Sequence, residues 1–155
     1  MKGPILEDVR IGEITVDGMD ATEVLLSLLK DMRFEVVMLG GVSFAGFNLI
    51  DPWAVYYRYG TPVIVVARKR PDNESVKRAL MRHFDDWADR WEVIRRLGKI
   101  HSVKTFSEEP PIYFEVVGAT EEWAAEVLKD CAMICRMPEP VRVARIVARG
   151  ISWLP

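Results

Sequence analysis

The sequence predicts an α/β fold in which a sheet containing parallel βαβ units is flanked by helices. Strand-like and helix-like segments alternate along the chain, which is typical of βαβ units. Two short, unbroken apolar runs, 36–39 and 63–67, resemble strands buried on both faces of such a sheet. A length of 155 residues, with no internal repeat and no low-complexity linker, indicates one domain over residues 1–155.

Composition excludes several classes of protein. Half of the residues are hydrophobic (50%) and 28% are charged, which is ordinary for a globular domain and unlike disordered or collagen-like chains. A net charge of −2 gives no overall attraction to nucleic acid, although a local basic patch would suffice. No apolar run approaches the roughly 18–20 residues of a membrane helix, and residues 1–8 lack the apolar stretch of a secretion signal. We therefore expect a cytoplasmic protein without a membrane span.

The first half of the chain provides clear start and stop signals. Ile11–Val16 alternates like a strand, and Asp17 follows it directly in an Asp-Gly turn. Asp20 begins a capping box, so its carboxylate is expected to accept backbone donors at the start of a helix over 21–32. The next strand is predicted at 36–39.

The second half follows the same logic. Asp51 and Pro52 begin a short helix that Gly60 ends, and the strand 63–67 comes next. The strands 36–39 and 63–67 are predicted to be adjacent and parallel. Further helices are predicted at 73–83, 87–97, 120–135 and 141–149, and further strands at 102–106 and 112–117.

Two cysteines lie four residues apart, so on a helix Cys131 and Cys135 would share one face and could form a metal pair. The only histidines are His83 and His101, and four-ligand zinc spacing is absent. The thiols are therefore predicted to pack as small hydrophobic groups.

Ligands of α/β sheets gather beyond the carboxyl ends of the strands, where this sequence places two candidate features. Asp17 could hold a hard cation such as Mg²⁺, or could simply form an Asp-Gly turn. Gly41–Gly46 has the spacing of a phosphate loop, but Phe47 and Asn48 stand where that loop needs Lys and Ser or Thr. Its glycines are predicted to allow tight turning or close backbone approach instead.

Two basic groups could contact phosphates. Arg68-Lys69-Arg70 follows the predicted strand 63–67 and lies where sites form in α/β sheets. Arg142, Arg145 and Arg149 recur at spacings of three and four and therefore line one helix face. Either group could bind nucleic acid, and the helix face could equally be a solvated surface.

Several segments together resemble one family in the same order along the chain. The resemblance covers nearly the whole chain and is carried by residues 14–22 (ITVDGMDAT), 44–51 (FAGFNLID), 63–71 (VIVVARKRP) and 138–144 (PEPVRVA). The family is the mainly archaeal domain of unknown function 99, which is similar to endonuclease V and is called endonuclease dU because it nicks at deoxyuridine.

The resemblance implies a ribonuclease H-like fold and a divalent-metal endonuclease of DNA repair that acts on deaminated DNA. Asp17 then matches a metal-binding acid for Mg²⁺ or Mn²⁺, and Lys69 matches a lysine positioned to meet a phosphate. These two residues are expected at neighbouring strand ends, with Gly40 between them. The residues that the resemblance and the basic patches place on nucleic acid are Arg68, Arg70, Arg142 and Arg145.

Two departures from the family pattern leave open whether catalysis is retained. Gly40-Gly41 stands where endonuclease V has Asp-Gly, and the chain starts after the two strands with which the family usually opens. One alternative is a non-catalytic domain that binds nucleic acid or protein through Lys69 and the arginine helix. Another is an oligomer that binds a small molecule through the loop 40–46. An open sheet edge would need cover, and we expect a second copy to supply it in a homodimer.

Overall fold

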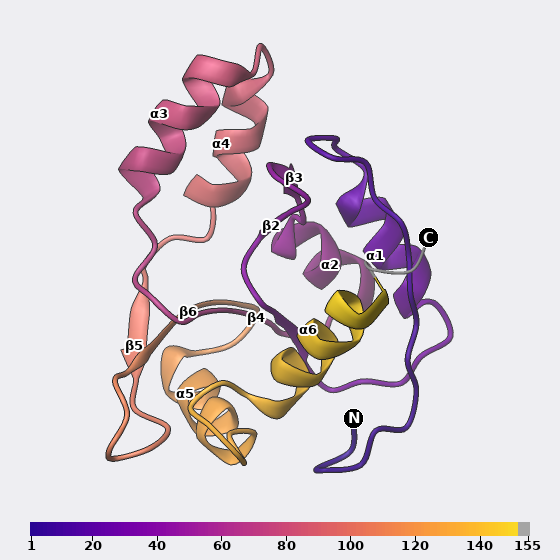
Figure 1. Ribbon diagram of the computed structural model, residues 1–155, viewed down its shortest axis with the longest axis vertical. Helices are drawn as coiled ribbons and strands as arrows, with labels where there is room; N and C mark the ends of the chain where they lie inside the picture. The colour runs from indigo at the N-terminus through magenta and orange to yellow at the C-terminus, as the bar shows by residue number, and fades with distance from the viewer. Residues whose placement is uncertain (152–155) are drawn as a thin grey trace.

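The computed structural model describes residues 1–151, which form a four-stranded mixed sheet, a small hairpin and the helices around them (Figure 1). The strands are β1 (Val37–Leu39), β2 (Ser43–Phe44), β3 (Asn48–Leu49), β4 (Val63–Ala67), β5 (His101–Val103) and β6 (Ile112–Val117). The helices are α1 (Ala21–Leu29), α2 (Pro52–Tyr59), α3 (Asn73–His83), α4 (Trp87–Arg95), α5 (Glu121–Asp130) and α6 (Glu139–Ile151).

The main sheet has the strand order β1-β4-β6-β5. β1 and β4 are parallel, with Val37 opposite Val63 and Leu39 opposite Val65, which confirms the pairing predicted from their apolar runs. β6 is antiparallel to both β4 and β5. The sheet is therefore mixed, and the expected βαβ arrangement is realised once, by β1, α2 and β4.

Helices cover both faces of the sheet (Figure 1). On one face α1 and α2 pack against a core that includes Val37, Leu39, Val63, Val65 and Val117. On the other face α5 and α6 pack against a core that includes Ile64, Val66, Ile112, Phe114, Leu128 and Val141. The α3–α4 pair stands at one end and packs on the β2–β3 hairpin through Leu49, Leu80 and Ile94.

The predicted strand 11–16 is wrong, since these residues form no strand in the structure. Their alternating pattern is suited to a sheet, but a strand also needs a neighbour, and none of residues 1–151 pairs with them. In consequence Asp17 does not follow a strand.

Several element ends also differ from prediction. α1 ends at Leu29, two residues before Asp31, whose φ of 64° cannot continue a helix. α5 ends at Asp130, so Cys135 lies beyond it and the two cysteines share no helix face; both are free and half-buried. α6 begins earlier than predicted, at Glu139, because Pro140 is tolerated in a first helical turn. Among the described residues, no helix is both long enough and apolar enough to cross a membrane.

Candidate functional site

The carboxyl end of β1 meets the first turn of α6. β1 is followed by Gly40, and a Cβ built on Gly40 would lie 3.1 Å from Cγ1 of Val141 in α6. Since β1 and β4 run in the same direction, Arg68-Lys69-Arg70 leaves the sheet at this same end, directly after β4. Gly40 and the basic segment after β4 therefore lie at the same end of the parallel pair.

Asp17 lies against the tip of the β2–β3 hairpin rather than at a strand end. Its N–H donates to the carbonyl of Ala45 at 2.9 Å, and its Oδ1 accepts from the N–H of Phe47 at 2.8 Å. Its backbone has a φ of 55°, in the left-handed region that Asp and Asn tolerate better than most residues. The residue is exposed, and its Oδ2 accepts no hydrogen bond from residues 1–151.

Gly46 makes this approach possible. A Cβ on Gly46 would lie 2.1 Å from Oδ1 of Asp17, which no side chain could occupy, and its φ of 82° also favours glycine. The glycines of this loop were predicted to allow close backbone approach, and at Gly46 the approaching group is the Asp17 carboxylate.

Arg90 of α4 holds the backbone around Asp17 through hydrogen bonds to three carbonyls. The residue is buried (5% exposed), and its Nη2 donates to the carbonyl of Asp17 at 2.9 Å. Its Nη1 donates to the carbonyls of Gly18 at 3.1 Å and Phe47 at 2.7 Å. Its Nε donates to Asp86 at 2.8 Å, and this hydrogen bond lowers the pKa of the Asp86 carboxyl, with burial opposing. One guanidinium therefore ties the Asp17 turn, the hairpin and α4 together.

Asn48 holds the other side of the turn. It is fully buried, its Nδ2 donates to the carbonyl of Thr15 at 2.8 Å and also to Asp20, and its Oδ1 accepts from the N–H of Ala21 at 3.0 Å. Asn48 rather than Asp20 therefore caps α1, which corrects the capping box predicted from sequence. The hydrogen bond from Asn48 and, to a smaller extent, the one from Thr15 lower the pKa of the Asp20 carboxyl.

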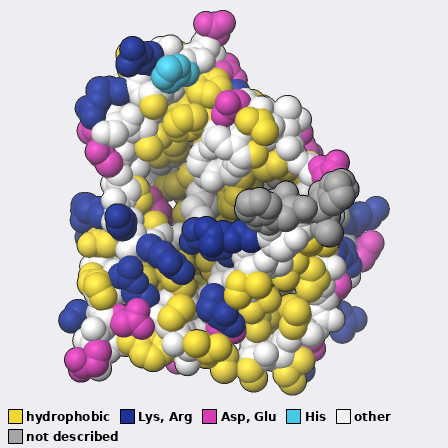
Figure 2. All heavy atoms as spheres, viewed as in Figure 1, with side chains coloured by type: hydrophobic (Ala, Val, Ile, Leu, Met, Phe, Trp, Pro, Cys, Tyr) yellow, Lys and Arg dark blue, Asp and Glu magenta, His cyan; other side chains and the backbone are white. Residues whose placement is uncertain are grey.

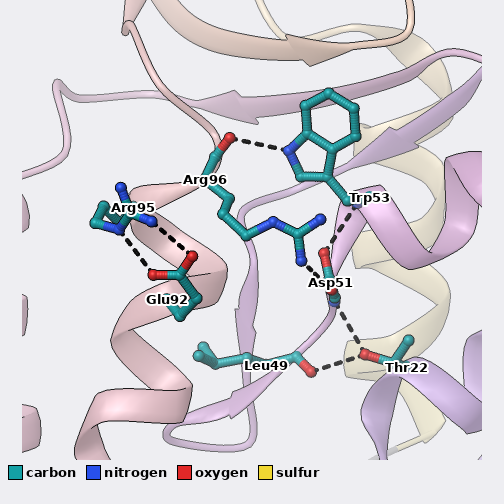
Figure 3. Close-up of polar contacts among 7 residues, drawn as sticks. All are labelled: Thr22, Leu49, Asp51, Trp53, Glu92, Arg95 and Arg96. Atoms are coloured by element: carbon teal, nitrogen blue, oxygen red, sulfur yellow. Dashed lines mark hydrogen bonds and ion pairs between the residues drawn. The ribbon is translucent and has the colours of Figure 1, made fainter.

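The hairpin is also anchored to α1 and α4 where it leads into α2 (Figure 3). Thr22 Oγ1 donates to the carbonyl of Leu49 at 3.2 Å and accepts from the N–H of Asp51 at 2.9 Å. Trp53 Nε1 donates to the carbonyl of Arg96 at 2.9 Å, and Arg96 lies 3.6 Å from the Asp51 carboxylate. These contacts anchor the hairpin against which Asp17 lies to α1, to the start of α2 and to the end of α4.

Cationic side chains gather on one face of the molecule. Figure 2 shows Lys and Arg across the middle of this face, between the α3–α4 pair and α6, below a hollow in the surface. Arg68, Lys69 and Arg70 are all exposed, and none forms an ion pair within residues 1–151. Exposed, unpaired cations of this kind can contact phosphates.

Arg142 differs from these free cations because Glu139 holds it. Its Nε donates to Glu139 at 2.8 Å and its Nη2 donates to the other carboxylate oxygen, which makes the contact bidentate. The contact lowers the pKa of Glu139 and raises the pKa of Arg142. Arg145 and Arg149, further along α6, are exposed.

The structure does not bring all the predicted site residues into contact. Asp17 contacts the hairpin tip, and no hydrogen bond or ion pair joins it to Lys69. The expected row of neighbouring strand ends, with Gly40 between Asp17 and Lys69, is not formed, because Asp17 follows no strand. Within residues 1–151, no group of three or more His, Cys, Asp or Glu side chains could hold a metal ion.

Sequence reasoning missed Arg90 and Asn48, the two buried groups that position Asp17. Asp86 and Arg90 are four residues apart, a spacing that indicates only a surface ion pair on a helix. The three carbonyls that Arg90 binds lie 43 to 73 residues away in the sequence, which no local pattern reveals.

The fold and the site define a mixed α/β domain in which a buried polar network holds an exposed carboxylate and free cations follow a parallel strand. The chain matches the profile of the family described as endonuclease dU over residues 1–152. It belongs to the endonuclease dU family, as its sequence motifs predicted.

Similar proteins occur in archaea. A UPF0215 protein of Methanosarcina acetivorans is 40% identical over 97% of this chain and 79% of its own length. A UPF0215 protein of Methanothermobacter thermautotrophicus is also 40% identical, over 97% of this chain and 74% of its own length. A crystal structure of a protein of unknown function from Archaeoglobus fulgidus aligns with a TM-score of 0.80 and 34% identity, covering 90% of this chain and 79% of that one.

Proposed function

We propose that this chain is a divalent-metal-dependent endonuclease that acts on deaminated DNA of the deoxyuridine type. Membership of the endonuclease dU family supports the reaction class. The observation that assigns the proposal to particular residues is the position of Asp17, an exposed carboxylate. The buried Arg90 donates to the carbonyl of Asp17, and the buried Asn48 donates to that of Thr15 in the same turn. A rigidly held, solvent-facing carboxylate is what a metal-dependent hydrolase requires.

Asp17 fits a metal ion only in part. Its Oδ1 is engaged with the N–H of Phe47, which leaves Oδ2 as the available ligand atom. Mg²⁺ is commonly held by one or two carboxylates, with water and substrate phosphates completing the shell, so one carboxylate predicts weak binding that substrate strengthens. When bound, Mg²⁺ or Mn²⁺ would supply Lewis-acid activation of water and of the phosphate.

The cations provide the contacts to DNA in this proposal. Lys69 acts as a point charge on a phosphate, with Arg68 and Arg70 beside it on the exposed segment after β4. Arg145 extends the same role along α6. Arg142 is oriented by Glu139, so it presents a guanidinium whose position is already set.

We also propose that the domain is of the ribonuclease H-like type. The parallel pair β1 and β4, with the antiparallel strands β6 and β5 beside it, supports this class. So does the placement of Arg68-Lys69-Arg70 beyond the carboxyl end of β4.

A nicking assay tests the function. Wild-type protein with Mg²⁺ or Mn²⁺ is expected to nick duplex DNA containing deoxyuridine, to leave the undamaged duplex intact, and to be inactive with excess EDTA. A deoxyinosine duplex in parallel identifies which deaminated base is recognised. Absence of metal-dependent nicking on every damaged duplex would overturn the proposed activity.

Matched variants assign the residues. Asp17→Asn should abolish nicking, whereas Asp31→Asn should not, although Asp31 is also exposed and has a similar φ of 64°. Lys69→Ala should weaken nicking, and Lys129→Ala, on the exposed surface of α5, should leave it unchanged. Equal activity of Asp17→Asn and wild type would remove Asp17 from the site.

The second candidate function is a non-catalytic domain that binds nucleic acid. The absence of a three-carboxylate group in residues 1–151, combined with the free cations after β4, favours this alternative. It predicts DNA binding that weakens steeply with salt, is lost in Lys69→Ala, and is unchanged in Asp17→Asn.

A further inference from the structure

Helix α3 carries a basic surface that the proposed site does not use. Residues 68–82, which run from the end of β4 through most of α3, contain six Lys or Arg and only two Asp or Glu, in a chain whose net charge is −2. Figure 2 shows Lys and Arg side chains over α3, at the upper left, as well as across the middle of the same face. Positive charge is therefore concentrated on this segment.

Two arginines of α3 point away from the core of the molecule. Leu80 is fully buried and, with Val76, packs against the β2–β3 hairpin and α4. At 3.6 residues per turn, Arg78 and Arg82 lie on the opposite side of the helix and are one turn apart. Both are exposed. Their guanidinium groups are therefore presented to solvent on the same outward face.

Neither arginine is neutralised by a paired carboxylate. Within residues 1–151, no ion pair includes Arg78 or Arg82. Arg78 donates to Ser75 Oγ at 2.8 Å, and this neutral acceptor leaves the positive charge in place. The Asp72 carboxylate caps the helix instead, since it accepts from the N–H of Ser75 at 3.0 Å and from its hydroxyl at 2.6 Å. The outward face of α3 thus retains its charge for a partner.

The length of this basic surface indicates the kind of partner. Arg70 is exposed and only two residues separate it from the start of α3, so the surface continues the basic segment after β4. A helix of 11 residues is about 16 Å long, which equals about five base pairs at 3.4 Å per phosphate of one strand. A row of cations of this length matches a phosphate backbone better than it matches a single small anion.

The α3 surface is also held in place relative to the candidate site. The core that joins α3 to α4 and to the hairpin contains Leu49, Leu80 and Ile94, all buried. On α4, Arg90 donates to the carbonyl of Asp17. A phosphate bound on α3 would therefore lie at a set distance from Asp17.

We propose that the outward face of α3, formed by Arg78 and Arg82 and continued by Arg70, binds the phosphate backbone of duplex DNA that flanks the reacting segment. Phosphate contacts carry no sequence information, so this binding is independent of the base and of its deamination. The inference rests on the proposed function for the identity of the substrate. Binding itself needs neither a metal ion nor nicking, so it can be measured separately.

The test measures binding of an undamaged duplex to the full chain by fluorescence anisotropy, in EDTA, over a series of salt concentrations. Each phosphate contact contributes about 0.9 to the slope of log K against log salt concentration. The double variant Arg78→Gln with Arg82→Gln should therefore reduce the slope by about 1.8 and weaken binding by about tenfold or more near 0.1 M salt. The double variant Arg78→Lys with Arg82→Lys keeps both charges and should retain the wild-type slope.

The matched control is the double variant Arg33→Gln with Arg58→Gln. Both arginines are exposed and belong to no ion pair among the described residues. They precede β1 and β4, so they lie at the opposite end of the parallel pair from Lys69. This control removes the same charge and should retain the wild-type slope. Equal slopes for the α3 variant and the control would overturn the inference.

Nicking and binding are scored separately. If the wild type nicks a deoxyuridine duplex and the α3 variant keeps the wild-type slope, the inference is wrong and the proposed function stands. If the slope falls at α3 and no damaged duplex is nicked, the inference stands and the proposed activity is wrong. Two other results would overturn the inference: no binding of the duplex by the wild type at low salt, or a loss at α3 that is confined to a single strand of the same sequence.

Discussion

Replacing Arg90 by methionine should destabilise this protein by about 2–4 kcal/mol, because it removes a buried guanidinium and keeps only the apolar stem. Three carbonyl oxygens and the Asp86 carboxylate would lose their donor. A hydrogen bond to a charged group contributes about 1.5–3 kcal/mol, but the losses do not add. Asp17 is exposed and the Asp86 side chain is 41% exposed, so water replaces part of what is lost.

Urea unfolding followed by tryptophan fluorescence measures this loss, with Arg95→Met as the matched control. Arg95 is on the same helix and pairs with Glu92 at 2.7 Å, but its side chain is 62% exposed. The control should therefore change stability by about 0–1 kcal/mol. In a thermal melt, Arg90→Met should lower the midpoint by roughly 5–15 °C. If the two variants unfold at the same urea concentration, Arg90 does not stabilise the Asp17 turn as described.

Three further predictions concern single positions. Gly46→Ala should destabilise the protein by about 2 kcal/mol or more, because the new Cβ would lie 2.1 Å from Oδ1 of Asp17. The control Gly60→Ala has a φ of 66° but open space around the new Cβ, so it should cost only about 1 kcal/mol in the same urea experiment. Burial raises the pKa of Glu115 to about 7, so the folded protein keeps a proton that the unfolded chain releases. As the pH rises from the unfolded pKa near 4.5 to pH 7, the free energy of unfolding should therefore fall by up to about 1.4 kcal/mol per pH unit. Glu115→Gln should remove that slope, and a slope that persists in this variant would show that another group causes it. Gly40→Asp should tighten Mn²⁺ binding, because it adds a second carboxylate. The new Cβ would lie 3.1 Å from Cγ1 of Val141, which must move by a few tenths of an ångström. An unchanged Mn²⁺ affinity would exclude Gly40 as a neighbour of the metal.

Local signals predicted most helices and the central strands. The strands 63–67 and 112–117 agree with β4 and β6. The continuous apolar run 63–67 indicates burial on both faces whatever its partners. Asp72 caps α3 as predicted, with its Oδ1 accepting from the N–H of Ser75 at 3.0 Å. Both kinds of signal depend on residues close together in sequence.

Pairing was less predictable than the existence of the elements. Ile11–Val16 has the alternation of a strand and fails to form one, since a strand requires a partner that no described residue provides. β6 is antiparallel to β4 because β5, α3 and α4 intervene and the chain returns in the opposite direction, which alternation of helices and strands did not reveal.

The candidate site was predicted residue by residue but not as a structure. The sequence identified Asp17 and the cations after β4, since an Asp-Gly turn and a basic run are visible as local patterns. It placed Asp17 at a strand end, whereas the structure places it against the tip of the β2–β3 hairpin. The groups that hold it, Arg90 and Asn48, act across 27 to 73 residues of sequence, so only the folded chain identifies them.

The claim that Asp17 provides a metal site is tested most directly by titrating Mn²⁺ into wild-type protein, Asp17→Asn and Asp31→Asn in the presence of a deoxyuridine duplex. Asparagine can still accept from the N–H of Phe47 and tolerates the φ of 55°, so the fold of Asp17→Asn should be retained. We expect Asp17→Asn to weaken Mn²⁺ binding by about tenfold or more and Asp31→Asn to bind as wild type does. Equal Mn²⁺ affinity in all three proteins would contradict the account.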